Sequence, residues 1–266
     1  MQLKIAHETR YEFAGPVSYS LHQLRLVPLS RAGQSHSNWQ IEIEGGTEEA
    51  RFFDQFNNET LLISVAPDAS RLSVHARGEV ETQDVSGVVG PHGGHAPLWL
   101  YTNPTPLTRP GPTIRKIAQA SSEDFQGDVP RLHHLMGIVA ESVKYETGAT
   151  DVSTTAEQAA AAGSGVCQDH AHIFVAAARL LGYPARYVSG YLMMNDRVEQ
   201  AATHAWAEVH LEALGWIGFD PSNAISPDAR YVAVATGCDY LDAAPISGLI
   251  VGGNTSRPQV TVQVQQ

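Results

Sequence analysis

The first 85 residues alternate hydrophobic and polar positions, which is the pattern of β-strands with one buried face. The longest alternating stretch is residues 3–13, and shorter ones follow at 39–44, 60–65 and 72–80. Glycine, asparagine or Pro-Asp turns separate these runs at nearly regular intervals. Short strands spaced in this way are typical of a β-sandwich or a small barrel. We therefore predict a sandwich-like, β-rich N-terminal domain over residues 1–85.

Residues 86–113 break this pattern, because five of these 28 positions are glycine and six are proline. Such a composition is typical of a linker or of an irregular loop that packing holds in place. The segment also contains Leu98–Tyr101, which is too apolar to be freely exposed to solvent. We predict a connector over residues 86–113 whose apolar part lies across the second domain.

From about residue 114, apolar residues recur every three or four positions, as on one face of a helix. One expected helix starts within residues 153–157 and ends at Gly163. The next starts within residues 164–166 and ends at Gly182. Strands are then expected at 186–192, 204–211, 216–220, 249–251 and 260–264. Residues 114–266 are therefore predicted to form a core with a helical part and an antiparallel sheet that includes the C-terminal strands, which makes the fold class α+β.

The composition is that of a globular chain, with 43% hydrophobic and 17% charged residues. It is neither disordered nor fibrous. No apolar run approaches the roughly 18 residues that span a bilayer. Met1–Glu8 alternates like a strand and lacks the hydrophobic centre of a signal peptide. We therefore expect a cytoplasmic location and no membrane partner.

Charge and cysteine content exclude further classes of protein. There are 17 basic and 28 acidic residues, and the resulting net charge of −11 repels phosphate backbones. A nucleic-acid partner is therefore not expected. Cys167 and Cys238 are the only cysteines, so a disulfide framework and four-cysteine zinc sites are excluded. A single bridge between these two cysteines fits poorly with a cytoplasmic location.

Cys167 falls in the first turn of the helix that is expected after residue 164. Backbone N–H groups without helical partners and the positive end of the helix dipole favour a thiolate at such a position. Gly163 and Gly165 leave room for a substrate carbonyl to approach the backbone. The alternative is that a single cysteine at the start of an apolar helix is only a small buried residue.

His204 begins an expected strand, and Asp220 ends the next one. Every second residue of a strand lies on the same face, so His204 shares its face with Trp206, Glu208 and His210, and Asp220 shares its face with Trp216 and Gly218. If a five-residue loop, 210–214, joins the two strands, Val209 lies opposite Gly215. The same register places His204 directly opposite Asp220.

Residues paired in this way have Cβ atoms roughly 4.5–5.5 Å apart. A carboxylate at that distance can hold the imidazole by one ring nitrogen and leave the other for a thiol. The alternatives are a surface histidine on a strand, one of 12 in the chain, and an Asp-Pro turn that ends a strand. A cysteine, a histidine and an aspartate in this order are the groups of a thiol nucleophile, its base and the acid that orients the base.

Residues 167–172 are rich in metal-ligand types, so a metal site is a further alternative. On a helix only His170, three residues on, shares a face with Cys167, whereas His172 points away. A zinc site would need a distant ligand such as His210, and none lies at signature spacing. We therefore predict neither a metal nor a cofactor.

Three further residues are candidates for the substrate pocket, namely Gln168, His170 and Trp206. Gln168 and His170 follow Cys167 on the same helix, and Trp206 shares the strand face of His204. Cys238 stands beside Asp239, whose charge disfavours a thiolate, so we expect Cys238 to be structural.

Four segments of the chain together resemble the bacterial transglutaminase-like superfamily: Gly163–His172, Arg186–Tyr191, Thr203–Val209 and Trp216–Asn223. The likeness covers about residues 130–225. A weaker likeness over residues 1–80 resembles the β-rich N-terminal domain of that family. The resemblance implies a papain-like core in which Cys167 is the nucleophile, His204 the general base and acid, and Asp220 the residue that orients His204.

The resemblance also implies acyl transfer, or the corresponding hydrolysis, without a metal. Crosslinking members typically carry tryptophan after the nucleophile, whereas this chain carries Gln168 and lacks calcium-binding loops. The similarity therefore favours a cysteine peptidase or amidase that acts on a peptide or amide substrate. Protein-glutamine amine transfer and a non-catalytic binding module on the same scaffold are the alternatives. The second oxyanion donor, besides the Cys167 N–H, and homo-oligomer formation are left open.

Overall fold

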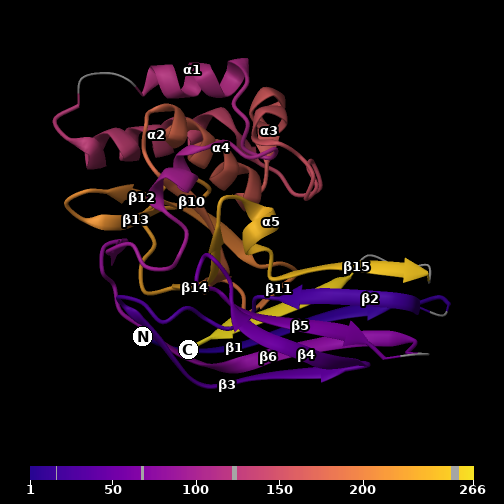
Figure 1. Cartoon of the computed structure of the whole chain (residues 1–266). Coiled ribbons are helices and arrows are strands. Elements are labelled where there is room, and N and C mark those ends of the chain that lie inside the picture. The colour runs from indigo at the N-terminus through magenta and orange to yellow at the C-terminus, as the bar shows by residue number, and fades with distance from the viewer. Residues whose placement is uncertain (16, 67–68, 122–124, 253–257) are drawn as a thin grey trace.

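Long antiparallel strands form where the first 82 residues alternate. The structure is a computed structural model, and it describes residues 1–15, 17–66, 69–121, 125–252 and 258–266. The N-terminal strands are β1 (Gln2–Glu12), β2 (Val17–Leu24), β3 (Gln34–Glu44), β4 (Gly46–Phe53), β5 (Glu59–Val65) and β6 (Arg71–Thr82). They divide between a five-stranded sheet, β11-β16-β1-β6-β3, and a four-stranded sheet, β15-β2-β5-β4. The two sheets stack as a sandwich, seen in the lower half of Figure 1.

The core of the sandwich lies between these two sheets. Leu24, Leu61 and Ile63 of one sheet pack against Leu72 and Val74 of the other, and all five are fully buried. The opposite face of the five-stranded sheet carries the alternate apolar residues of β1. The predicted sandwich-like N-terminal domain is confirmed, and so is the α+β class of the whole chain.

The C-terminal strands belong to the sandwich, in contrast to the prediction. β15 (Ile246–Gly252) pairs with β2, and β16 (Gln259–Gln265) pairs with β1. Even β11 (Glu199–Gln200), which lies within the predicted core, pairs with β16. The prediction that groups these strands with the 114–266 core is therefore wrong. Alternation identifies which face of a strand is buried, but it does not identify the neighbouring strand.

The second part of the molecule is a five-stranded sheet covered by helices. The sheet has the order β14-β10-β12-β13-β7, in which all strand pairs are antiparallel. Its strands are β7 (Val88–Gly90), β10 (Ala185–Leu192), β12 (His204–Leu211), β13 (Gly215–Phe219) and β14 (Tyr231–Gly237). The helices are α1 (Pro112–Ala120), α2 (Asp128–Ser142), α3 (Ala156–Ala162), α4 (Cys167–Leu180) and α5 (Tyr240–Ala243). Helices α1–α4 lie above the sheet in Figure 1, where their apolar faces meet one buried face of the strands.

Helix α3 starts within the range that the sequence predicts. Thr155 is the N-cap, and its side chain and that of Gln158 form a capping box. Glu157, in the first turn of α3, accepts hydrogen bonds from the backbone N–H groups of Gly111, Thr113 and Ile114. The carboxylate thus binds the N–H groups at the start of α1, which have no partner within that helix. Glu157 therefore joins α3 to α1.

The connector packs against the core, as the apolar run predicts. β7 adds an edge strand beside β13, and the short 3-10 helix η1 (Leu98–Thr102) follows. Tyr101 in η1 is buried against Trp216, with ring centroids 5.1 Å apart. Buried Arg179 of α4 donates to the Tyr101 carbonyl at 2.8 Å.

In the part of the chain that the structure describes, no helix is long and apolar enough to cross a bilayer.

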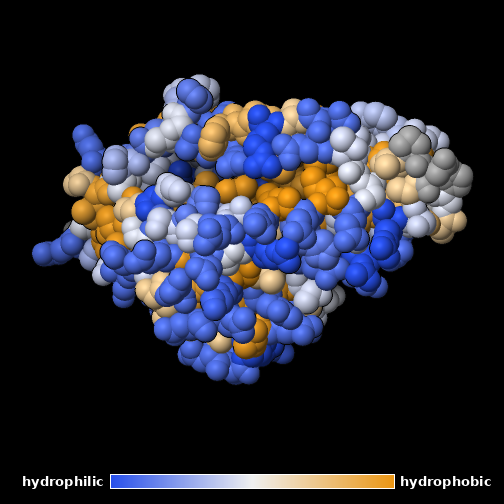
Figure 2. Space-filling model, turned by 90° about the horizontal axis from the view of Figure 1, so that it is seen from below, coloured by the Kyte–Doolittle hydropathy of each residue, from blue (hydrophilic) through white to orange (hydrophobic). Residues whose placement is uncertain are grey.

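The sandwich docks on β14, the edge strand of the core sheet. Side-chain amides of the sandwich bind the backbone of this edge: Gln34 contacts Ala233 by two hydrogen bonds of 2.8 Å, and Asn58 contacts Thr236 by two more of 2.8 Å. An amide side chain offers a donor and an acceptor, so it can replace a neighbouring strand. Apolar residues seal the rest of this interface, and they are Leu3, Ile5, Val80, Val262 and Val264 from the sandwich with Tyr191, Val232 and Val234 from the core. The underside of the molecule, seen in Figure 2, is mostly hydrophilic and is interrupted by hydrophobic patches.

Candidate functional site

Two glycines and a short parallel strand pair position Cys167. Gly163 ends α3 in the left-handed conformation, with φ of 68°. The chain then pairs as β9 (Ser164–Gly165) with β8 (Lys144–Tyr145) before α4 begins at Cys167. The Asp169 carboxylate accepts from the Val166 N–H at 2.8 Å and fixes this start. Cys167 is a free, half-buried cysteine in the first turn of α4, as predicted.

His204 and Asp220 contact each other directly. The His204 Nε2–H donates to Asp220 Oδ2 at 2.7 Å, and both side chains are buried. The strand register nevertheless differs from the prediction, because Val209 pairs with Ile217 and Leu211 pairs with Gly215. The turn is thus shorter than five residues, and the register moves by two positions. A shift of two positions keeps each side chain on its face, so His204 and Asp220 still meet, although not as a directly opposite pair.

A ring of donors holds the Asp220 carboxylate. Ser222 donates to Oδ1 through its backbone N–H at 2.9 Å and its hydroxyl at 2.7 Å. The Asn223 amide and the Tyr231 hydroxyl donate to Oδ2 at 2.7 and 2.8 Å. Burial alone would raise the pKa of Asp220, but the hydrogen bonds from His204, Ser222 and Asn223 outweigh burial and lower it to about 2. Asp220 therefore stays ionised at neutral pH.

The imidazole of His204 lies between the carboxylate and the thiol. Its Nε2 is bound to Asp220, and its other ring nitrogen has no partner among the hydrogen bonds of the described residues, while Cys167 lies near enough to shift the pKa of the imidazole. Burial would lower the pKa of His204, but the contacts with Asp220 and Cys167 outweigh burial and raise it to about 10. The three residues predicted from the sequence thus lie together at one site.

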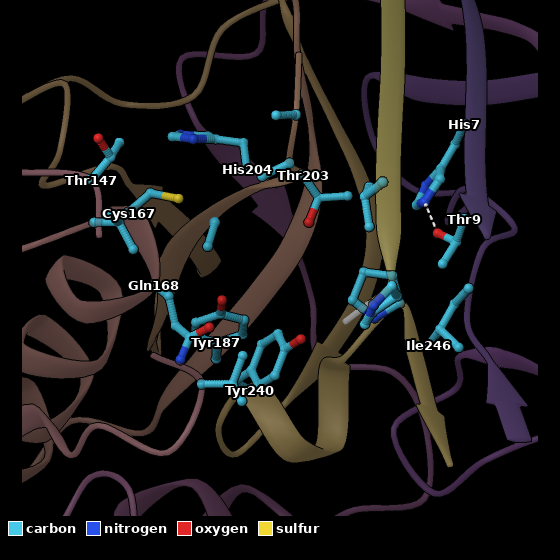
Figure 3. Close-up of a pocket in the computed structure, with 18 of the residues that line it drawn as sticks. His7, Thr9, Thr147, Cys167, Gln168, Tyr187, Thr203, His204, Tyr240 and Ile246 are labelled. Carbon is cyan, nitrogen blue, oxygen red and sulfur yellow. Dashed lines mark hydrogen bonds between the residues drawn. The ribbon is translucent and has the colours of Figure 1, made fainter. Parts of the chain in front are cut away.

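A cavity of about 340 Å³ opens beside the sulfur. In Figure 3 the Cys167 sulfur points into the space between the core, on the left, and sandwich strands that carry His7, Thr9 and Ile246, on the right. Gln168 lies in the wall of this cavity, near Tyr187 and Tyr240, as predicted for a pocket residue.

Trp206 does not line the cavity, in contrast to the prediction. It is fully buried, and its ring stacks on that of His204 with centroids 6.2 Å apart and an interplanar angle of 28°. Gly190 on the neighbouring strand makes this possible, because a Cβ there would overlap the Trp206 ring. Trp206 therefore supports the imidazole from within the core and makes no cavity wall.

His170 does not line the cavity either. It is buried, and its ring nitrogens lie 2.9 Å from the Val166 carbonyl oxygen and 2.8 Å from that of Val143. These contacts fix the end of α2 to the start of α4. Sequence spacing places His170 one turn after Cys167 on the same face of α4. At the position of His170, however, this face packs against Val143 and not against the cavity.

Tyr145 is a residue of the site that the sequence analysis missed. It lines the cavity and pairs across from Gly165, two residues before Cys167, and its ring stacks on that of His170 with centroids 6.1 Å apart. Burial and the neighbouring Cys167 raise the pKa of Tyr145 to about 12, so its hydroxyl stays protonated. A strand of two residues is too short to show alternation, and no signal in the sequence pointed to Tyr145.

Metal ligands do not gather around this site. Among the described residues, no three or more His, Cys, Asp or Glu side chains are grouped so as to hold a metal ion. The other cysteine, Cys238, is free and buried, and burial raises its pKa to about 12.

Comparison with known proteins agrees with both parts of this fold. Residues 115–221 match the model of the transglutaminase-like superfamily, and residues 3–81 match that of the bacterial transglutaminase-like N-terminal region. The chain therefore contains a transglutaminase-like core and a bacterial transglutaminase-like N-terminal region. This result confirms the resemblance seen in the sequence.

Individual relatives share different portions of the chain. An uncharacterized protein of Mycobacterium leprae is 25% identical over an alignment of 279 positions that covers 99% of this chain and 98% of that protein. A protein-glutamine gamma-glutamyltransferase of Pseudomonas aeruginosa is 33% identical over an alignment of 97 positions that covers 32% of this chain and 14% of that protein. The crystal structure of a cysteine protease candidate from Cytophaga hutchinsonii has the same fold, with a TM-score of 0.77, 20% identity and coverage of 100% of this chain and 91% of its own.

Proposed function

We propose that this protein is a thiol-dependent enzyme that cleaves an amide or peptide bond through a Cys-His-Asp triad and a thioester intermediate. The observation that carries the proposal is the grouping of three side chains beside a cavity: His204 is bound to Asp220, and Cys167 and His204 line the same cavity. The proposed mechanism requires the Cys167 sulfur to react as a thiolate, and His204, whose pKa is raised to about 10, is protonated at neutral pH and supplies the opposite charge. Asp220 holds the imidazole in place through Nε2.

In the first step the Cys167 sulfur forms a bond to the amide carbonyl carbon, and the carbonyl oxygen becomes an oxyanion. N–H groups in the first turn of α4, which have no acceptor within the helix, stabilise this charge. The Tyr145 hydroxyl is the second donor in our proposal, because it lies beside Cys167 and stays protonated. The carbon–nitrogen bond then breaks, and His204 gives its proton to the leaving amine.

In the second step water attacks the thioester while neutral His204 accepts a proton from it. The carbon–sulfur bond breaks, the carboxylic acid leaves, and the ion pair of Cys167 and His204 is restored. Gln168 stands where crosslinking members typically carry tryptophan, which supports water over an amine as the acceptor.

Amine transfer is the second candidate, and one observation favours it. The glutamyltransferase of Pseudomonas aeruginosa shares 33% identity with part of this chain. An amine and water can resolve the same thioester, so the two candidates differ only in the second step. Added primary amine would shift the product from acid to amide if transfer is the natural reaction.

The test is to trap the acyl group. An N-acyl amino acid p-nitrophenyl ester is mixed with the protein, the reaction is quenched in acid, and peptide mapping by mass spectrometry locates the added acyl mass. We expect the acyl group on Cys167, a loss of the nitrophenol burst in Cys167→Ala, and a full burst in Cys238→Ala. An equal burst in Cys167→Ala, or an acyl group on Cys238, would refute the proposal and leave the non-catalytic binding module.

A further inference from the structure

The cavity beside Cys167 is built from both parts of the molecule. The start of α4 and the strand β12 supply Cys167, Gln168 and His204, while β1 and β15 supply residues such as Thr9 and Ile246. Figure 3 shows these two groups facing each other across the opening. The sandwich therefore forms one wall of the space that a bound substrate would occupy.

The described residues that line this cavity include no lysine, arginine, aspartate or glutamate. Besides Cys167 and His204, the titratable groups in the wall are His7 and four tyrosines. Burial lowers the pKa of His7 to about 4, and its ring nitrogens bind the hydroxyls of Tyr191 and Thr9 at 2.9 Å each. His7 is therefore neutral at pH 7.

The tyrosines of the wall are neutral as well. Burial raises the pKa of Tyr11 to about 12, and that of Tyr187 well above its usual value. The pKa values of Tyr145 and Tyr240 are raised too. Apart from the Cys167–His204 pair, the wall thus consists of uncharged groups, namely hydroxyls, the Gln168 amide, the His7 imidazole and apolar side chains such as Val166 and Ile246.

We propose that this cavity is the subsite for an uncharged group of the substrate next to the reacting carbonyl, and that it excludes lysine, arginine, aspartate and glutamate side chains. This inference rests on the proposed function. A charged group in the cavity would lose water without gaining an opposite charge, which is strongly unfavourable. A neutral side chain with apolar surface and a hydroxyl or amide would satisfy both the apolar residues and the hydroxyls of the wall. The volume of about 340 Å³ is at the lower end of the range of roughly 300–1,000 Å³ seen for ligand pockets.

The net charge of the chain and the neutral wall of the cavity have opposite effects on a cationic substrate. The chain carries a net charge of −11, which attracts cations over long distances. The neutral wall would nevertheless reject a lysine or arginine side chain at the final step. Cationic probes therefore separate the effect of the cavity from that of the overall charge.

The test compares the rates at which peptide chloromethyl ketones alkylate Cys167. The sulfur displaces chloride and forms a thioether, so the rate reports the fit of the side chain next to the ketone. In the wild type we expect glutamine, leucine and tyrosine probes to react about 100-fold faster than lysine and glutamate probes. Iodoacetamide, which carries no side chain, serves as the reference for reactivity of the thiol.

Ala202 offers a way to change the wall without disturbing the core. It is exposed, lies in the loop before β12 and lines the cavity. Ala202→Asp should raise the rate of the lysine probe about five-fold, as an exposed ion pair allows, and Ala202→Lys should do the same for the glutamate probe. Ala213→Asp and Ala213→Lys are the matched controls, because Ala213 is exposed in the β12–β13 turn and does not line the cavity. They make the same change in net charge and should leave both rates unchanged.

The outcomes separate this inference from the proposed function. If iodoacetamide alkylates Cys167 no faster in the wild type than in His204→Ala, the proposed function fails and the subsite fails with it. If iodoacetamide reacts fast but charged and neutral probes react at equal rates, the subsite alone is refuted. Equal responses of the Ala202 and Ala213 variants would also refute it, because overall charge would then explain the selectivity.

Discussion

Each of the two cysteines of this chain has a histidine and an aspartate nearby, but the two sites differ in how those residues are bound. Cys167 lies near His204, which is bound to Asp220. Cys238 is followed by Asp239, and His172 is bound to the nearby Tyr240. Residue types alone would therefore make both regions candidates for thiol chemistry. The difference lies in what each imidazole binds and in what each sulfur can reach.

At Cys238 the imidazole is already occupied. His172 Nε2 accepts a hydrogen bond from the Tyr240 N–H at 3.0 Å, and burial lowers its pKa to about 4. The backbone of Cys238 is engaged as well, because its N–H donates to Asp242 and its carbonyl accepts from Arg179. Burial raises the pKa of Cys238 to about 12, and Asp242 and Asp239 act in the same direction. This region holds a helix start in place and offers no base to its thiol, in agreement with the structural role predicted for Cys238.

At Cys167 the imidazole of His204 is bound to a carboxylate through Nε2 and lines the same cavity as the sulfur. Asp220 is ionised and accepts five further hydrogen bonds, so it accepts from His204 without moving. The sulfur also faces a cavity instead of packed side chains. In the proposed mechanism a reactive cysteine requires an imidazole that is not held by the backbone and an open approach to the sulfur. Of the two regions compared, only that around Cys167 combines them.

The largest expected effect is on the rate of acylation, and it distinguishes the two histidines. His204→Ala should lower the rate of acylation of Cys167 about 10,000-fold, because the thiol loses the group that ionises it and the leaving amine loses its proton donor. His172→Gln is the matched control, since glutamine can still accept from the Tyr240 N–H. It should lower thermal stability and leave the acylation rate of the folded protein within about two-fold of wild type. Burst amplitude and rate in single-turnover experiments give both numbers, and comparable loss in both variants would contradict the assignment.

The candidate catalytic residues could be predicted from the sequence because a register error of two positions leaves each strand residue on its face. A turn of the wrong length moved the pairing by two residues, yet His204 and Asp220 kept their faces. The position of Cys167 was equally local, since Gly163 and Gly182 delimit its helix.

The parts that failed depend on long-range packing. Trp206 and His204 share a face, but parity does not say that Gly190 lets the Trp206 ring sink into the core. The C-terminal strands alternate correctly, but only the folded chain shows that β15 and β16 complete the sandwich. Thr9 contributes to the cavity because the sandwich docks on the core. The sequence contains no local pattern that predicts how these two parts dock.

The next effect concerns stability and separates Asp220 from a merely structural acid. The pKa of His204 is raised from 6.5 to about 10, so its stabilising contribution is complete below pH 6.5 and disappears as the pH rises through 10. The pKa of Asp220 is lowered from 3.8 to about 2, so its contribution is complete above pH 3.8 and disappears as the pH falls through 2. Asp220→Asn should therefore reduce the free energy of unfolding most between pH 4 and 6.5, by about 3 kcal/mol.

Urea unfolding at a series of pH values measures this difference. The double variant His204→Ala/Asp220→Asn is the control, since the pH-dependent part attributable to the pair should vanish in it. A stability difference between wild type and Asp220→Asn that does not shrink toward pH 10 would show that His204 and Asp220 do not form an ion pair.

The smallest expected effect sharpens the contrast within the cavity itself, between two tyrosines of its wall. Tyr145→Phe should lower kcat about ten-fold and leave KM nearly unchanged, because its hydroxyl would act only on the oxyanion. The loss is smaller than the 100- to 1,000-fold typical of a buried donor, since Tyr145 is half exposed. Tyr240→Phe removes a hydroxyl from the same cavity on the side away from the sulfur, so it should change KM and not kcat. If both variants change only KM, Tyr145 is a wall residue like Tyr240, and stabilisation of the oxyanion falls to the first turn of α4 alone.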